Sequence, residues 1–494
     1  MTHERAPAGV AGPPDADPAG ERTLPPGRDS GAEAAAEQTL TIEADAAAPP
    51  QAVARGGGTF ESFRHRDFSL FWAGALVSNV GSWMQAYALG IVVYGLRRSS
   101  FDLGLVNFLS GVPVLFLALP AGAIADRVDR RRLLITIQVV LLVQAAALGA
   151  FYNAGLLSAR DPVAALVWVA TLGLVGGVSM AFMGPAFQSM MPDLVPRRLL
   201  MNSIALNSAQ FQSARLLGPL VAAAVVLAGA GMGEVFYVNA ASFLFVIAAL
   251  WAIRLDRAAG PGAAPGRGHG APSSEGSWRQ ASWVALTAGL RYARQDRAVG
   301  VLVLSTAIMT LCAFPYMTLL PAIVATSLGH SGRELSRTVA FVMAANGLGA
   351  LAGALGVASL PATVRRERII PFALAALAVL LVGFALSRWL PLTLGLSTVA
   401  GAALLASSSL TNTSIQMVVP GHLRGRVMAL FVLAFMGMMP ISGLAFGSLG
   451  QAIGPARAVL VGAVLLLAWA AVLLARPRLL RAGTRVAVGE PSRG

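Results

Sequence analysis

The 494-residue chain has one cysteine, five histidines and 37 basic residues, all of which are arginine because lysine is absent. The lone thiol, Cys312, excludes an intramolecular disulfide and a cysteine-based metal site. The histidines lie in tails, loops or the edges of apolar runs, without ligand-spaced partners: His3, His65, His269, His330 and His422. We therefore expect no metal and no cofactor. The pattern also argues against a membrane-embedded enzyme, which needs a nucleophile with a base or a metal cluster.

Charged residues are also scarce: they make up 12% of the chain, against 56% hydrophobic residues. The mean hydropathy is +0.68. Repeated apolar runs of about 20 residues are typical of membrane spans. The net charge of +14 would suggest a nucleic-acid partner in a soluble protein, but here the arginines fall mostly at the ends of apolar runs. Nucleic-acid binding is therefore not expected, and the lipid bilayer is the expected environment.

The apolar runs predict an all-α, polytopic membrane protein with about twelve spans in two six-helix halves. The first half, 59–254, has spans near 70–96, 101–125, 133–154, 163–190, 199–230 and 233–253. The second half, 298–477, has spans near 298–326, 337–360, 369–387, 390–418, 423–451 and 455–476.

Three segments lack such runs. Residues 1–58 are rich in Ala, Pro, Gly and acids, which predicts a disordered tail. Residues 255–297 form a Pro- and Gly-rich linker that contains a short amphipathic helix over 283–292, expected to lie along the membrane surface. Residues 478–494 form a second tail.

The arginines alternate from loop to loop. Counted from the N-terminus, every second loop is rich in arginine, whereas Arg97 and Arg98 run against this trend. Because arginine-rich loops remain in the cytoplasm, the pattern predicts that both termini and the linker are cytoplasmic.

The densest group of charges lies in the loop after the second span, between Gly122 and Arg132. It cannot lie in hydrocarbon, where a central Arg or Asp costs roughly 2.5–3.5 kcal/mol. We expect Gly122 to permit close helix packing and Asp126 to lie near the positive end of a neighbouring helix. The arginines are expected to pair with acids and with helix C-terminal carbonyls. Such contacts can break and re-form, which suits a gate; the alternative is a purely topological anchor.

The spacing of this loop resembles the loop motif of the major facilitator superfamily, here Gly122, Asp126, Arg127, Arg130 and Arg131. Asp129 stands where the motif has a second glycine, which resembles the branch of bacterial enterobactin exporters and macrolide efflux proteins. The resemblance covers residues 63–476 and extends to Phe68-Ser69-Leu70-Phe71-Trp72-Ala73-Gly74. It implies the major facilitator fold and a small-molecule substrate bound between the halves. It also implies a location in the inner membrane of a bacterial cell and export of a drug, antibiotic or siderophore by alternating access with proton antiport.

Arg215 is the most conspicuous polar residue inside a span, near the middle of the fifth. Gln212, Arg215 and Pro219 recur at helical spacing, so they share one face, expected to point toward a central cavity or the other half. Leu217-Gly218-Pro219 resembles the antiporter motif of exporters in this superfamily, with alanines in place of its following glycine pair. The alternative is a kink and close-packing site without a coupling role.

Other polar residues inside spans are candidate cavity residues: Asn79, Gln85, Asn107, Tyr316, Asn346, Asn412 and Gln416. For each of them alone, a helix–helix hydrogen bond is the alternative. Trp83, Phe211, Phe314 and methionines would form an apolar wall suited to a bulky amphipathic substrate. No carboxylate lies clearly near a bilayer midplane. Proton coupling would therefore fall to Asp102 or Asp126, or act indirectly through Arg215.

Two other functions remain open from the sequence. One is an importer or facilitator for a small nutrient, and the other is a membrane sensor that no longer transports. We expect the chain to be a monomer.

Overall fold

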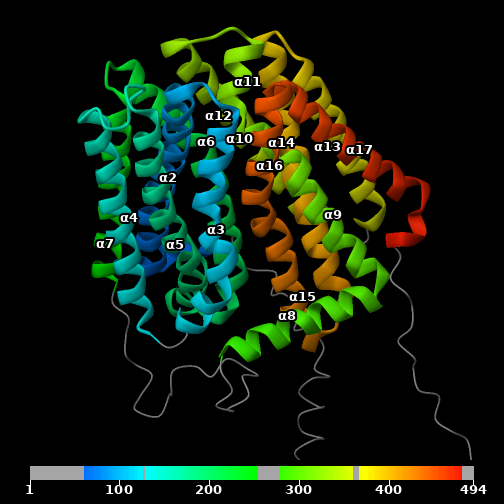
Figure 1. Ribbon diagram of the computed structural model, residues 1–494. Coiled ribbons are helices and arrows are strands. Elements are labelled where there is room, and N and C mark those ends of the chain that lie inside the picture. Colours follow the sequence, from blue (N-terminus) through cyan, green and yellow to red (C-terminus); the bar gives the residue numbers. More distant parts are fainter. Residues whose placement is uncertain (1–59, 126–127, 254–277, 360–365, 481–494) are drawn as a thin grey trace, which may run out of the picture. The chain divides into compact units, whose positions relative to one another are not determined.

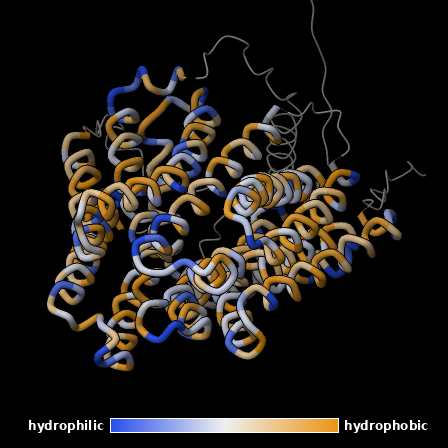
Figure 2. The backbone as a smooth tube through the Cα atoms, turned by 90° about the horizontal axis from the view of Figure 1, so that it is seen from above, coloured by the Kyte–Doolittle hydropathy of each residue, from blue (hydrophilic) through white to orange (hydrophobic). Residues whose placement is uncertain are grey.

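The computed structural model describes residues 60–125, 128–253, 278–359 and 366–480. These residues are nearly all helical and include no β-strand (Figure 1). Twelve helices are long and apolar enough to cross a membrane. Hydrophobic residues predominate along these helices (Figure 2). The predicted fold class and number of spans are therefore confirmed.

The first half begins with a short 3-10 turn, η1 (Glu61–Arg64). Its spans are α2 (Arg66–Arg97), α3 (Ser100–Ala125), α4 (Arg130–Asn153), α5 (Pro162–Leu194), α6 (Leu200–Leu227) and α7 (Met232–Ala252), with the turn η2 (Arg197–Leu199) before α6. Several ends are set by the sequence, because an aspartate before the first turn can accept a backbone N–H that the helix leaves free. Asp129 accepts from the N–H of Arg132 at the start of α4, and Asp161 accepts from Ala164 at the start of α5.

The second half comprises α9 (Arg297–Ala313), α10 (Pro315–Thr318), α11 (Leu320–Ser327), α12 (Gly332–Ala358), α13 (Arg366–Leu386), α14 (Leu390–Val418), α15 (Gly421–Val432), α16 (Met438–Ile453) and α17 (Pro455–Ala475), with the turn η4 (Pro477–Leu480). Two spans predicted as continuous are interrupted. The first breaks into α9, α10 and α11 around Pro315 and Pro321, which lack a backbone N–H. The second contains a π-helical turn, η3 (Leu433–Gly437), between α15 and α16.

The helix bundle has two ends, which we name by their connections. The motif face is the end at which α3 leads into α4, and the far face is the end at which α2 leads into α3. Helix α8 (Trp278–Gln295), longer than the predicted 283–292, packs against the start of α15 (Figure 1). A Cβ at Gly289 would lie 2.7 Å from the Arg426 carbonyl oxygen, so the two backbones are in close contact.

The two halves meet along two seams, α3 against α16 and α6 against α12. At the first seam the backbones approach closely, because a Cβ at Gly104 would lie 3.0 Å from the Gly447 Cα and would also overlap the Gly443 carbonyl. Small residues allow membrane helices to pack this closely.

The buried side chains form two hydrophobic clusters. The larger draws on both halves, with Tyr87 and Val106 from the first and Tyr316 and Phe446 from the second. The smaller one, which includes Phe68, Leu134 and Met190, contains residues of the first half.

Candidate substrate site between the two halves

Arg215, near the middle of α6, forms a hydrogen bond with the opposite half. Its Nη2 donates to the Asn346 Oδ1 on α12 at 2.6 Å. The Asn346 Nδ2 donates in turn to the Tyr316 hydroxyl on α10, and to the Ser397 carbonyl oxygen on α14 at 3.3 Å. Asn346 and Tyr316 are fully buried. We call Arg215, Asn346 and Tyr316 the central junction.

Close backbone packing brings the central junction together. A Cβ at Gly347 would lie 2.7 Å from the Cα of Leu216, so α12 reaches α6 because residue 347 has no side chain. On the other side of α6, a Cβ at Gly218 would overlap the Trp83 side chain and lie 2.8 Å from the Val80 carbonyl. Gly218 and its neighbour Pro219 are buried at this contact between α6 and α2. The close contacts at Gly347 of α12 and at Gly218 of α6 therefore hold α6 between α12 and α2.

The other neighbours of Arg215 are aromatic. The Arg215 guanidinium lies 5.5 Å from the centre of the Trp83 ring, within cation–π range. Trp83 contacts Phe211 edge-on, with ring centres 5.9 Å apart, and Phe211 is 43% exposed. In the part of the chain that the structure describes, the buried Arg215 Nε and Gln212 Oε1 have no hydrogen-bond partner. The site thus combines a guanidinium, an amide and an aromatic wall.

Two of the other candidate cavity residues lie in contacts within the first half. Asn79 donates to Gln210 at 3.3 Å. Gln85 donates to Gln144 at 3.2 Å and accepts from Asn239 at 2.8 Å. Asn79 and Gln85 therefore form hydrogen bonds between helices, which is the alternative to a role in the cavity.

Three further candidates lie elsewhere on the two halves. Asn107 lies at the first seam, where its Oδ1 would be 2.6 Å from a Cβ on Gly443. Gln416 donates to Asn412 at 2.8 Å, one turn away on α14. Neither set of contacts includes a residue of the central junction.

Sequence reasoning missed several polar residues that these contacts use. Gln144, Gln210 and Asn239 are buried inside predicted spans, so the rule that intramembrane polar residues face protein could have selected them as well.

Asp102, a possible proton carrier from the sequence, is paired with Arg97, with 3.1 Å between the Arg97 Nε and the Asp102 Oδ2.

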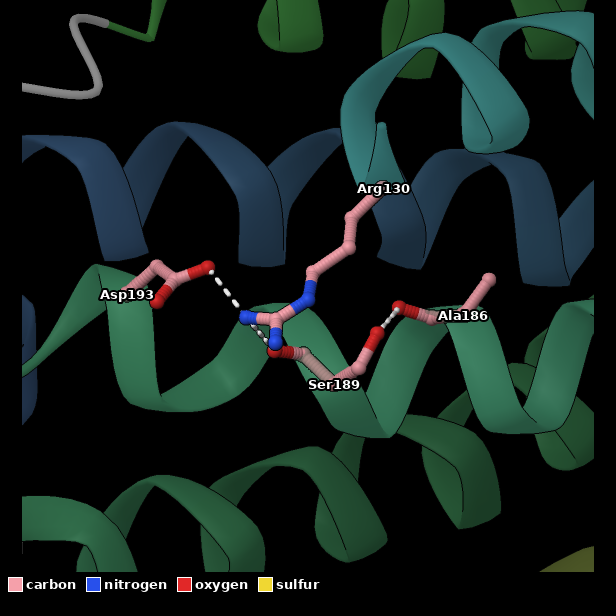
Figure 3. Close-up of polar contacts among 4 residues, drawn as sticks. All are labelled: Arg130, Ala186, Ser189 and Asp193. Carbon is pink, nitrogen blue, oxygen red and sulfur yellow. Dashed lines mark hydrogen bonds and ion pairs between the residues drawn. The ribbon is translucent and has the colours of Figure 1, made fainter. Parts of the chain in front are cut away.

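The charged loop contacts the first half at the motif face. Arg130 donates to the Ser189 carbonyl oxygen at 3.0 Å and to the Asp193 Oδ2 at 2.9 Å, near the end of α5 (Figure 3). Arg131 donates to the Trp251 carbonyl oxygen at 2.8 Å, at the end of α7. These two arginines thus join α4 to α5 and α7.

The other motif residues of the charged loop are Gly122, Asp126, Arg127 and Asp129. Asp129 caps α4. Asp126 and Arg127 lie outside the described residues. A Cβ at Gly122 would meet no described heavy atom within 4 Å, so the close packing expected there stays a prediction.

The described residues contain no group of three or more His, Cys, Asp or Glu side chains that could hold a metal ion. Two helical halves, joined at mid-depth by a polar junction between otherwise apolar spans, define a membrane transporter of the major facilitator type. Comparisons with known proteins give the family. Residues 57–485 match the transmembrane secretion effector family, and the chain belongs to this family of the major facilitator superfamily.

Curated relatives are transporters. The chain is 25% identical to the multidrug efflux pump Tap of Mycolicibacterium fortuitum over 400 residues, which are 78% of this chain and 86% of Tap. It is 30% identical to the staphyloferrin A transporter of Staphylococcus aureus over 157 residues, 32% of this chain and 38% of that protein. The family and these relatives are transporters and not enzymes.

Solved structures share the fold. A bacterial homologue of the human lysosomal transporter Spinster, in an inward-facing and occupied conformation, aligns with a TM-score of 0.61 at 14% identity. That alignment covers 86% of this chain and 98% of the other. The nucleoside transporter NupG aligns with a TM-score of 0.60 at 12% identity, over 83% of this chain and 99% of NupG. These structures show the fold, and the family match together with the twelve candidate spans makes the chain a multi-pass membrane transporter.

Proposed function

We propose that this chain exports a hydrophobic or amphipathic small molecule, such as a drug, an antibiotic or a siderophore, by alternating access. The observation that carries the proposal is the central junction, in which Arg215 of one half bonds Asn346 of the other at mid-depth. Substrates of two-halved transporters bind near the midplane between the repeats. Tap, a multidrug efflux pump that aligns along most of this chain, supports export and a broad substrate class.

Two hydrogen bonds join the halves toward the far face. There the Tyr87 hydroxyl donates to the Ser336 carbonyl oxygen at 2.9 Å, and the Ser100 N–H donates to the Gln451 Oε1 at 3.1 Å. Both bonds join the two halves. The hydrophobic cluster that is shared by the halves includes Tyr87, whereas the separate cluster around Phe68 and Leu134 belongs to the first half. This asymmetry supports a conformation that is closed at the far face.

The arginine pattern supports a cytoplasmic motif face. The proposed orientation has both termini and the linker in the cytoplasm of a bacterial cell, and the protein in the inner membrane. A far-face-closed conformation would then admit cargo from the cytoplasm, as an exporter requires. A monomer suffices, because the proposed path lies between the halves of one chain.

Proton antiport is the proposed energy source, and Asp102 is a candidate carrier. In the described part of the chain it is the one charged residue that is almost fully buried, with 1% exposed. Protonation of Asp102 would remove its ion pair with Arg97 near the far face. A buried carboxylate whose protonation breaks an ion pair can couple proton entry to a movement of helices. Asp126 is the second candidate from the sequence.

Drug susceptibility and proton movement test the export proposal. A hypersensitive bacterial host expressing the chain should tolerate higher concentrations of at least one amphipathic compound than the host with an empty vector. Everted vesicles should release protons from the lumen when that compound is added, as a pH-sensitive dye would report. Empty-vector vesicles are the control. If no compound of a broad panel is extruded and no proton movement depends on substrate, the export proposal fails; nutrient uptake in a null host would instead support import.

A further inference from the structure

Arg215 has a positive charge without a described negative partner. Its hydrogen bond goes to the neutral amide of Asn346, and its other described neighbours are the ring of Trp83 and the Tyr316 phenol, which is uncharged at neutral pH. No described ion pair includes it, and its Nε has no hydrogen-bond partner. Arg215 is partly exposed, but its Nε is buried, and withdrawing a charged group from water costs free energy unless it is paired and hydrogen-bonded. The middle of the bundle therefore has one positive charge to be balanced.

We propose that Arg215 binds the anionic group of an amphipathic acid, so that the exported cargo carries a carboxylate or a comparable anion. The inference rests on the proposed export function and specifies its substrate class. Guanidinium presents N–H donors in a planar fork that matches a carboxylate, and such charge-assisted bonds are stronger than bonds to a neutral amide. The cargo anion would replace the Asn346 oxygen and free the two halves at the central junction.

The surroundings of Arg215 fit the rest of an amphipathic molecule. Phe211, on the same helix, is 43% exposed and meets Trp83 edge-on, so the two rings offer an apolar surface beside the charge. Gln212 lies one turn from Arg215 and its Oε1 has no described partner, so it can accept a hydrogen bond from a hydroxyl or N–H of the cargo. The anion, the apolar body and a donor group would each have a partner.

Binding of a matched probe series tests the proposal. The probes are 11-(dansylamino)undecanoic acid, its methyl ester and the corresponding primary amine. Purified full-length protein in lipid nanodiscs is titrated, and energy transfer from tryptophan to dansyl reports binding. Transfer should fall in Trp83→Phe, because that ring lies beside the proposed anion site. The acid should bind at least ~10-fold more tightly than the ester, the size of a charge-assisted hydrogen bond.

Two substitutions separate the charge of Arg215 from its structural role. Arg215→Gln should abolish the preference for the acid while leaving the affinity for the ester within about twofold. Asn346→Asp keeps the volume of the side chain and places a carboxylate 2.6 Å from the guanidinium, where it competes with the cargo anion. It should weaken acid binding ~10-fold or more, although Arg215 is still present. Arg333→Gln on α12 removes an exposed charge and should leave the preference intact.

The results distinguish this inference from the export proposal. Equal binding of acid and ester by the unmodified protein, or a preference that survives both Arg215→Gln and Asn346→Asp, overturns the anion site. If Arg215→Gln does not fold, Asn346→Asp alone decides. Export of neutral or cationic drugs without any Arg215-dependent acid binding would leave the export proposal standing and refute the anion site. Arg215-dependent acid binding without transport of any probe or drug would support the site and refute export.

Discussion

The close contact between α3 and α16 makes a quantitative prediction about conformational balance. In Gly104→Ala, the new Cβ would lie 3.0 Å from the Gly447 Cα and 3.0 Å from the Gly443 carbonyl carbon, and would overlap the carbonyl oxygen. All three atoms are backbone, so they cannot rotate away. The carbonyl oxygen is the nearest of the three, so α16 must move by more than the ~0.4 Å that would restore the other two contacts to 3.4 Å. Overpacking of this kind costs ~1–3 kcal/mol, which corresponds to a ~5- to 150-fold shift away from the far-face-closed conformation.

Thiol accessibility measures this shift. Ser100 is buried at the seam, so a Ser100→Cys reporter should react slowly with a membrane-impermeant maleimide while the far face is closed. The background is Cys312→Ala, which removes the one native thiol. The labelling rate should rise ~5-fold or more when Gly104→Ala is added. Gly95→Ala is the matched control, because a Cβ there meets no described atom within 4 Å. An unchanged labelling rate in Gly104→Ala would refute the seam as the far-face closure.

Three further substitutions test the remaining proposals. Tyr87→Phe removes the bond to the Ser336 carbonyl, worth ~1 kcal/mol, and should raise labelling of the same reporter ~5-fold; a rate equal to that of the parent contradicts a role in closure. Asp102→Asn should abolish substrate-dependent proton movement in everted vesicles while binding of the amphipathic probes persists, and retained proton movement would exclude Asp102 as the carrier. Asp126→Asn should lower efflux at least ~10-fold, the size of one charge-assisted contact in the gate proposed from the sequence, with unchanged folding by size-exclusion chromatography. Unchanged efflux in this variant would contradict a gating role of the charged loop and favour a purely topological anchor.

The spans were predictable because a membrane imposes a length on them. The predicted 390–418 coincides with α14 (Leu390–Val418), and 101–125 differs from α3 (Ser100–Ala125) by one residue. The interruptions were not predictable from the same rule. Pro113 and Pro219 lie inside continuous helices, whereas Pro315 and Pro321 begin new ones. Neighbouring helices can satisfy the backbone groups that a proline frees, and those neighbours are not visible from local sequence.

The site was predictable residue by residue but not as pairs. Helical spacing placed Arg215 on a face toward the cavity or the other half, and the structure has it bonded to Asn346, 131 positions away. The register between α6 and α12 depends on the close approach at Gly347, which no local pattern reveals. The same polarity rule selected Gln85, which binds Gln144 and Asn239 within the first half. Sequence gives a residue its depth and its helix face, while packing decides which neighbour it meets.

The contrast between these two polar groups suggests why the central junction, rather than the Gln85 network, is the better substrate site. Gln85, Gln144 and Asn239 are neutral and bind one another, so an incoming ligand would have to break balanced bonds to gain similar ones. Arg215 is charged and bonds a neutral oxygen, so an anion can offer it a stronger partner than the one it leaves. Because that bond also joins the halves, its replacement by cargo would remove a restraint on their movement. Binding at Arg215 would then favour a change of conformation, whereas binding at the Gln85 network would alter contacts inside one half.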